Sequence, residues 1–386
     1  MGGFNDTTVT EFLLLGLSAH AEQEVVLCGL FLGLYLVTLS GNLLIILAIS
    51  CDPRLHTPMY FFLANLSSVD VCFSSVTVPK MLVSHVVGSK SISYVQCMTQ
   101  TYFFLTFANM DGFLLSVMAY DRYVAICQPL HYTMIMRPKL CVLLVAISWV
   151  TVNLHALLHT LLMVRLNFCS SNTVNHFFCD LYAVLKLSCS DTFINHLMAF
   201  TEGGLIFLTP FTCIVVSYVC TFSKVLKLPS AQGIRKALST CGSHLTVVSL
   251  FYGAILGVYM HPSSSYSVHD RVASVIFTVV TPLVNPFIYS LRNWDMKAVV
   301  LLAPNLSPSH SGVLKRGVLG GIHSPLLCLP VPRRGFKETK ESGPLGTRAL
   351  GPSPWTLRPN TFPCPAWDHR LSKGSGDQVV IGRALR

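Results

Sequence analysis

Two groups of side chains in this chain have the residue types and spacing of metal ligands. His155 and His159 are four residues apart, which places both imidazoles on one face of a helix. His176, Cys179 and Asp180 form a second group within five residues. The sequence near the first pair offers no third ligand, and Cys179 is a better candidate for a disulfide. We therefore predict no metal site at either place.

Four further polar side chains lie near the middle of long apolar runs: Asn42, Asp70, Asp111 and Asn285. Charged groups inside a bilayer are costly and usually face the interior of a helix bundle. If their oxygens converge, they would suit a small hard cation such as sodium. The same residues would equally form an interhelical hydrogen-bond network with one carboxyl protonated. The sequence leaves both interpretations open.

The sequence contains none of the common catalytic signatures. It has no Gly-x-Ser-x-Gly elbow, no His-Glu-x-x-His and no phosphate-binding glycine loop. We predict neither an enzyme nor a bound cofactor. Asp121-Arg122-Tyr123, directly after the third apolar run, could hold a helix end in one state and release it in another, or be an ordinary charge pair. Pro286 would kink the seventh run.

The elements that carry these residues are apolar runs long enough to cross a bilayer. The chain of 386 residues is 52% hydrophobic, only 11% charged and has a mean hydropathy of +0.58, whereas soluble proteins are about 25% charged. Continuous apolar blocks indicate helices rather than barrel strands. The sequence predicts an all-α membrane protein with seven spans at about 25–49, 58–79, 97–120, 140–163, 195–220, 238–260 and 272–290.

The loop charges predict the orientation of these spans. Residues 1–24 contain no Lys or Arg, and the loops on that side hold five, against ten on the other side. The positive-inside rule then places the N-terminus outside and the C-terminus in the cytoplasm. Asn5 begins a glycosylation sequon in the outer segment. We expect no cleaved signal peptide, because no basic residue precedes the first span.

The same topology divides the fourteen cysteines. Eight lie in or beside the spans and should act as small apolar residues, while Cys328 and Cys364 should stay reduced in the cytoplasm. Four face the oxidising side: Cys97, Cys169, Cys179 and Cys189. They allow three pairings, which the sequence does not separate.

The segment 303–386 differs from the rest of the chain. It contains eleven Pro and eleven Gly, and twelve Lys and Arg against four Asp and Glu, so it carries +8 of the net charge of +10. This composition predicts a disordered basic tail, and its basic pairs could attract anionic lipid. Nucleic-acid binding is not predicted, since no basic-aromatic module is present.

Six motifs occur in order along residues 25–302. They are Gly41-Asn42, the stretches 55–63 (LHTPMYFFL) and 118–127 (MAYDRYVAIC), Ser217-Tyr218, and the stretches 236–244 (KALSTCGSH) and 282–289 (PLVNPFIY). Together they resemble a rhodopsin-type (class A) G-protein-coupled receptor, and specifically an olfactory receptor. The resemblance covers about residues 4–300. Phe251-Tyr252-Gly253 replaces the Cys-Trp-x-Pro stretch that most rhodopsin-type receptors have.

This resemblance implies a multi-pass plasma-membrane receptor. A small volatile hydrophobic molecule would bind within the bundle, and an olfactory-type stimulatory G protein would raise cyclic AMP. Positions matching the family's pocket are Phe104, Leu105, Ala108, Asn109, Glu202, Ile206, Tyr252, Ile255, Leu256, Tyr259, Val275 and Thr278. Those matching its switch and coupling residues are Asp121, Arg122, Tyr123, Tyr218, Asn285, Pro286 and Tyr289. The resemblance also implies disulfides Cys97–Cys179 and Cys169–Cys189, with Cys97–Cys189 left open.

The resemblance fades at about residues 299–302, where an altered reading frame or alternative last exon would explain the tail. A receptor of the same fold for a non-odorant small molecule in another tissue is the main alternative. A channel or transporter would need inverted repeats or a row of charges along one path, and the sequence shows neither. A membrane metal hydrolase built on His155 and His159 is a third class.

Overall fold

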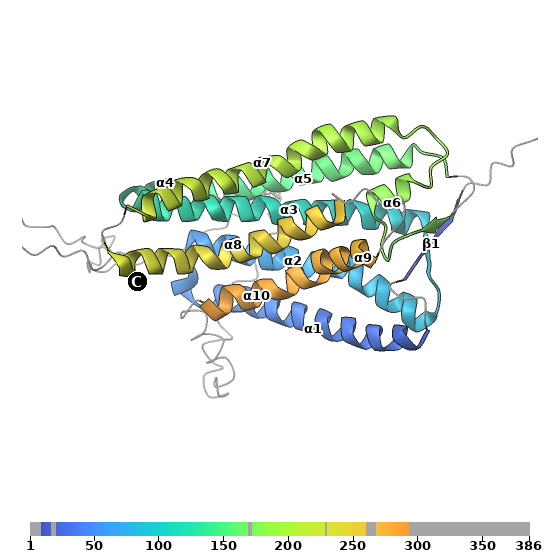
Figure 1. The fold of residues 1–386 in the computed structure, drawn as a ribbon, viewed down its shortest axis with the longest axis horizontal. Coiled ribbons are helices and arrows are strands. Elements are labelled where there is room, and N and C mark those ends of the chain that lie inside the picture. The colour runs from blue at the N-terminus through green and yellow to red at the C-terminus, as the bar shows by residue number, and fades with distance from the viewer. Residues whose placement is uncertain (1–8, 17–20, 169–171, 228–229, 260–267, 293–386) are drawn as a thin grey trace, which may run out of the picture. The chain divides into compact units, whose positions relative to one another are not determined.

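Seven membrane-length helices form the bundle, as the sequence predicts, in a computed structural model that describes residues 9–16, 21–168, 172–227, 230–259 and 268–292. The first six spans are α1 (Ala21–Cys51), α2 (Pro58–Val87), α3 (Tyr94–Cys127), α5 (Pro138–Val164), α7 (Phe193–Val225) and α8 (Ala231–Tyr259). The seventh combines α9 (Val268–Val275), the π-helical segment η3 (Ile276–Val280) and α10 (Thr281–Arg292). These helices run alongside one another (Figure 1).

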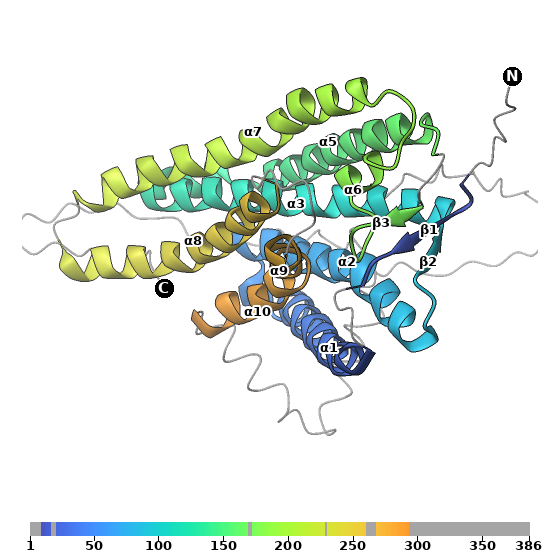
Figure 2. The same ribbon diagram turned by 45° about the vertical axis from the view of Figure 1, so that its right-hand side comes forward.

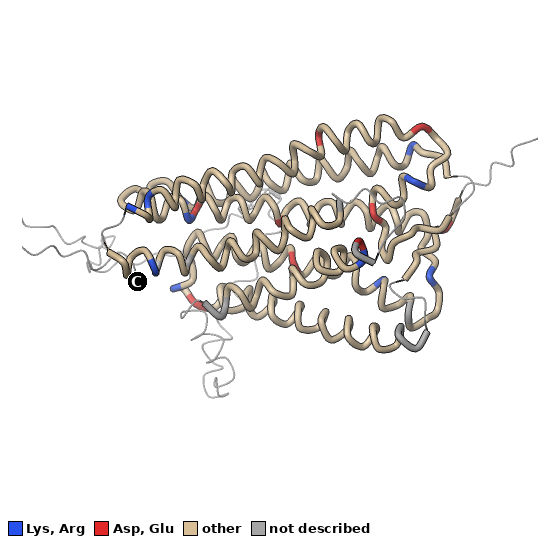
Figure 3. The backbone as a smooth tube through the Cα atoms, in the orientation of Figure 1, with Lys and Arg blue, Asp and Glu red and all other residues tan. Residues whose placement is uncertain are grey.

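Helix α3 lies at the centre of the bundle and packs against α2, α5 and α7. In its most apolar stretch 67% of the residues are buried, against 22% in α1. Outward side chains of α1 such as Val25 and Leu36 remain exposed. In a bilayer they face hydrocarbon, and the helices satisfy their own backbone hydrogen bonds there. Lys and Arg lie mostly toward the helix ends (Figure 3).

Most of the helices extend beyond the apolar runs that predict them. Helix α3 begins at Tyr94 because Ser93 and Gln96 form a capping box, in which each side chain bonds the other residue's backbone N–H. It continues to Cys127, so Asp121 and Arg122 lie in its last turns rather than after it. Polar residues at a membrane boundary keep helical hydrogen bonds even where the hydropathy falls.

A small three-stranded sheet covers the end of the bundle at which α3 begins and α5 ends, and the sequence analysis did not predict it. Strand β1 (Glu11–Leu14) lies between β2 (Ser91–Ser93), antiparallel, and β3 (Thr173–Val174), parallel (Figure 2). Phe12 and Leu14 are buried in an apolar cluster that includes Met163. Only four residues of β1 alternate between exposed and buried positions, too short a pattern to stand out in the sequence.

Four short helical segments complete the connections. They are η1 (Pro53–Leu55), η2 (Pro129–His131), α4 (Tyr132–Ile135) and α6 (Leu181–Leu185). The segments η2 and α4 follow α3, where they bring Tyr132 back to its last turns. Helix α6 begins at Asp180, whose side chain accepts hydrogen bonds from the N–H groups of Tyr182 and Ala183.

Helix α10 approaches α1 closely near the middle of the bundle. A Cβ atom on Gly41 would lie 3.2 Å from the Cβ of Pro286. The side-chain amide of Asn42 donates a hydrogen bond of 3.1 Å to the carbonyl of Pro282. Pro286 lies within α10, as the sequence predicts. A glycine and a proline therefore set the distance between the first and seventh spans.

Candidate functional site

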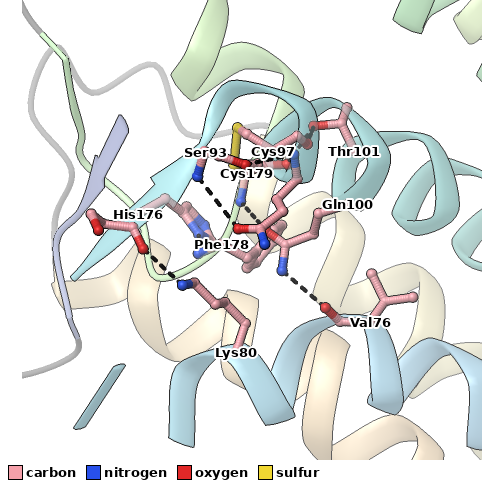
Figure 4. The surroundings of a disulfide bond; sticks show 11 residues. Val76, Lys80, Ser93, Cys97, Gln100, Thr101, His176, Phe178 and Cys179 are labelled. Atoms are coloured by element: carbon pink, nitrogen blue, oxygen red, sulfur yellow. Dashed lines mark hydrogen bonds between the residues drawn. A yellow bond between two sulfur atoms is a disulfide. The ribbon is translucent and has the colours of Figure 1, made fainter. Parts of the chain in front are cut away.

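The disulfide Cys97–Cys179 ties the start of α3 to the loop between α5 and α7. Around it, the Thr101 hydroxyl donates to the carbonyl of Cys179, and the side chain of Gln100 accepts from the N–H of Cys179 (Figure 4). The pairing implied by the resemblance is confirmed, and Cys97–Cys189 is excluded. The other implied bond involves Cys169, which lies outside the described residues, as does the sequon at Asn5.

The disulfide holds the loop residues 176–178 inside the bundle. Phe178 stacks on Phe104 of α3 with ring centroids 4.5 Å apart. The imidazole Nε2 of His176 lies 3.1 Å from the hydroxyl of Ser274. Burial lowers the pKa of His176 to about 4, although Asp180 and Asp270 act in the opposite direction. His176 is therefore neutral at physiological pH. The sequence analysis did not identify Phe178 as a candidate site residue.

An aromatic group lies below this loop and includes two of the predicted ligand-contact residues. Phe104 contacts Phe277 with centroids 6.1 Å apart, and Phe277 contacts Phe251 at 5.6 Å. Tyr252 of α8 packs against Phe251 at 5.1 Å. These contacts place predicted residues of α3 and α8 in one apolar region.

The hydroxyl of Tyr252 is the unusual polar group of this region. Its side chain is 4% exposed, yet the hydroxyl has no hydrogen-bond partner in the part of the chain that the structure describes. The hydroxyl faces Gly112 of α3, where an added Cβ would lie 3.5 Å from its oxygen. Leaving such a group unpaired costs about 1–3 kcal/mol. A ligand that accepts this hydrogen bond would recover that cost.

Other predicted contact residues have less distinctive surroundings. Asn109 and Thr278 donate to carbonyls within their own spans. Leu256 is 41% exposed. Leu105, Ile206, Ile255 and Val275 are half-buried, and Ala108 is buried. The side chain of Tyr259 lies outside the described residues.

Among the predicted contact residues, Glu202 is distinct because its carboxylate contacts two histidines of α5. Its Oε2 lies 2.7 Å from Nδ1 of His155 and 3.1 Å from Nε2 of His159. The sequence near the two histidines lacks a third ligand, but the fold supplies one from farther along the chain. The missing partner comes from another helix, 43 residues after His159. The single acid in the fifth apolar run was the sequence signal that could have located it.

The polar residues at mid-depth converge only in part. Both carboxylate oxygens of Asp70 accept from the side-chain amide of Asn285, at 3.1 and 2.9 Å. Asn42 bonds backbone carbonyls instead. One carboxylate oxygen of Asp111 is buried without a hydrogen-bond partner among the described residues. The hydrogen-bond network is present for Asp70, and the sodium interpretation stays a prediction.

At the other end of the bundle, polar side chains from four spans gather around Arg122. Asp121 accepts a hydrogen bond of 2.8 Å from the hydroxyl of Tyr132, and burial raises the pKa of Tyr132, which keeps that hydroxyl protonated. The hydroxyl oxygen of Tyr218 on α7 lies 2.9 Å from Nδ1 of His244 on α8. Arg122 is close enough to influence Tyr218, His244 and Tyr289 electrostatically.

The sequence reading assigned no role to Tyr132 or His244. Both contribute through contacts between segments that are distant in sequence. His244 is fully buried and its Nε2 has no hydrogen-bond partner among the described residues. The buried hydroxyl of Tyr289 also has no hydrogen-bond partner among the described residues. Each of these unsatisfied buried groups, one on α8 and one on α10, calls for a partner that the described residues do not supply in this structure.

Comparison with known proteins agrees with this architecture. The sequence profile of the olfactory receptor family matches residues 31–303. Olfactory receptor 1f45 of Rattus norvegicus is 59% identical over 301 residues, which cover 78% of this chain and 96% of that protein. Olfactory receptor 1E1 of Pan troglodytes is 58% identical, and olfactory receptor 1F1 of Homo sapiens 56%, with the same coverage. The chain therefore belongs to the olfactory receptor family and is a multi-pass, seven-helix odorant receptor of the plasma membrane, not an enzyme.

Proposed function

We propose that this receptor binds small, volatile, mostly apolar odorants between α3, α7, α8 and the seventh span, close to Tyr252. Binding then favours a state that activates an olfactory-type stimulatory G protein and raises cyclic AMP. The unpaired, buried hydroxyl of Tyr252 carries this proposal. An odorant with one oxygen acceptor matches its surroundings, which are otherwise aromatic and aliphatic.

The rings around Tyr252 define the kind of molecule that fits. Phe207 and Phe211 of α7 lie with centroids 5.3 and 4.9 Å from the Tyr252 ring. The proposed contact residues also include Phe104, Leu105, Ala108, Asn109, Ile206, Ile255, Val275 and Thr278. Leu256, Tyr259 and Glu202 belong to the same predicted set, with Glu202 at its α5 side. Such a lining favours short aldehydes, ketones and esters over charged compounds.

Signalling requires that the odorant bind one receptor state more tightly than the other. We propose that the second state rearranges the side chains around Arg122. Asp121, Tyr123 and Tyr218 would move with the helix ends, and Asn285, Pro286 and Tyr289 with the seventh span. The hydrogen bond from Tyr132 to Asp121 supports this, because it gives the carboxylate a partner other than Arg122.

Replacing Tyr252 with Phe tests the proposal with little change in ring packing. Loss of one hydrogen bond should raise the half-maximal concentration of oxygen-containing agonists about 3- to 10-fold. Hydrocarbon-like agonists should be unaffected. The measurement is cyclic AMP in cells that express the receptor and are exposed to a panel of volatile compounds.

Tyr35→Phe is the matched control, because it removes a hydroxyl that bonds Ser75 between α1 and α2. Arg122→Ala should reach the cell surface and give no cyclic AMP response. Equal potency of every agonist at wild type and Tyr252→Phe would remove Tyr252 from the binding site.

A further inference from the structure

Three metal-ligating side chains meet between α5 and α7, outside the aromatic region proposed for odorants. They are His155 and His159 of α5 and Glu202 of α7. One nitrogen of each imidazole and one carboxylate oxygen lie within 4.8 Å of one another. Of all groups of His, Cys, Asp and Glu in the described residues, this is the one whose ligand atoms converge in this way.

Helix geometry fixes this arrangement. The two histidines are one turn apart, and their rings lie 4.6 Å from each other, centroid to centroid. Glu202 follows the N-terminus of α7 by about two and a half turns, the same depth at which α5 carries His155 below its C-terminus. Gly203, next to Glu202, faces the His155 ring, which would lie in ordinary van der Waals contact with a Cβ at that position, 3.9 Å away.

The surroundings suit a cation with nitrogen and oxygen ligands. Both imidazoles are buried, 6% and 2% exposed, while the Glu202 side chain is 30% exposed. The spans of α5 and α7 in which these residues lie are otherwise strongly apolar, with mean hydropathies of 2.1 and 2.0 over their most apolar stretches. A carboxylate there is stabilised by a cation or by hydrogen bonds.

We propose that His155, His159 and Glu202 form a binding site for Zn²⁺ that bridges α5 and α7. Two histidines and one glutamate are a ligand set found in zinc proteins, with a fourth position left for water. Ligand atoms around tetrahedral zinc are about 3.3 Å apart. Oε2 of Glu202 lies 2.7 and 3.1 Å from the two imidazole nitrogens, distances that need a small expansion. The three ligand atoms lie within 4.8 Å of one another, so any pair near that limit must draw closer. Coordination requires both imidazoles to be neutral, with Nδ1 of His155 and Nε2 of His159 unprotonated and the ring proton on the other nitrogen.

Glu202 also belongs to the proposed odorant-contact set, so the test of the zinc site uses no odorant. Full-length receptor is purified into lipid nanodiscs, freed of metal with a chelator, and titrated with ZnCl₂ against a chromophoric zinc chelator. Wild type should hold a zinc ion that His159→Gln and Glu202→Gln bind at least tenfold more weakly, since even second-shell changes cost about 10- to 100-fold.

His196→Gln is the matched control, because it removes an exposed imidazole from the same helix as Glu202 and should leave zinc affinity unchanged. A second measurement uses wild-type receptor alone, so it does not depend on whether a variant folds. Micromolar Zn²⁺ should raise the apparent unfolding temperature of wild type, and Mg²⁺ should not, because zinc stabilises the state that binds it.

Either of two results overturns the proposal. One is equal zinc affinity in wild type, His159→Gln and Glu202→Gln. The other is an unfolding temperature of wild type that does not respond to zinc. Because both measurements are made without agonist or G protein, neither result bears on the odorant site near Tyr252.

Discussion

Single buried side chains make the stability of this receptor depend on pH. His176 is the clearest case, since it links the loop behind the Cys97–Cys179 disulfide to Ser274 of the seventh span. Its pKa in the folded receptor is about 4, below the ordinary value of 6.5. The folded state therefore binds the proton more weakly than the unfolded state does. Its contribution to stability is complete above pH 6.5 and is lost as the pH falls toward 4.

We predict that the apparent unfolding temperature of the purified receptor falls between pH 7 and pH 4.5 partly because of His176. The full pKa difference corresponds to about 3 kcal/mol. His176→Gln keeps a polar group near Ser274 without a titrating ring, so this variant should lose less stability over the same range. Thermal unfolding at several pH values measures the difference.

His131→Gln is the control for this series, because His131 is exposed on η2 and should behave as wild type does. A pH profile of His176→Gln identical to that of wild type would show that other groups cause the acid sensitivity. Asp180 and Asp270 are the acidic groups that influence His176, and both remain in the variant.

The contact between α1 and α10 shows what a single contact between two helices contributes to stability and signalling. Gly41 and Gly33 both lie on α1, but only Gly41 has Pro286 against it. A methyl group on Gly33 meets nothing within 4 Å, whereas one on Gly41 meets two ring carbons at 3.2 and 3.3 Å. A proline ring in a helix cannot rotate away, so the helices themselves must separate.

We predict that Gly41→Ala lowers the apparent unfolding temperature and weakens the cyclic AMP response, because overpacking costs about 1–3 kcal/mol and displaces Pro286. Gly33→Ala should leave both unchanged or raise stability slightly, since Ala is a better helix former than Gly. Thermal unfolding in nanodiscs and the cellular response of both variants provide the comparison. Equal behaviour of the two variants would contradict the proposed role of this contact.

The helices themselves were predictable from the sequence, and their rotations were not. Apolar length predicted each span, because a bilayer demands about twenty apolar residues whatever their neighbours. Which way Glu202 points depends on how α7 turns against α5, and no local pattern encodes that. Tyr132 and His244 were missed for the same reason. Strand β1 forms only because β2 and β3 lie on either side of it.

In the molecule as a whole, the similarity to the olfactory receptor family and the proposed functional residues both end near the end of the seventh span. The family profile ends at residue 303, and every proposed odorant, switch and zinc residue precedes Arg292. The basic charge of the chain, by contrast, belongs almost wholly to residues 303–386. The composition that suggests a basic protein therefore describes the tail and not the receptor domain.

We predict that a receptor ending at Leu302 keeps its surface delivery and its cyclic AMP response, or improves them. The physical reason is that the helix bundle buries its apolar surface within residues 9–292, while a segment rich in Pro, Gly and like charges adds little to such a core. Surface labelling and agonist titration of the truncated receptor measure both. A receptor whose residues 303–386 are replaced by a Gly/Ser linker of equal length separates the effect of length from that of sequence. Loss of signalling in both altered receptors would mean that this tail, although unlike the rest of the family, takes part in coupling.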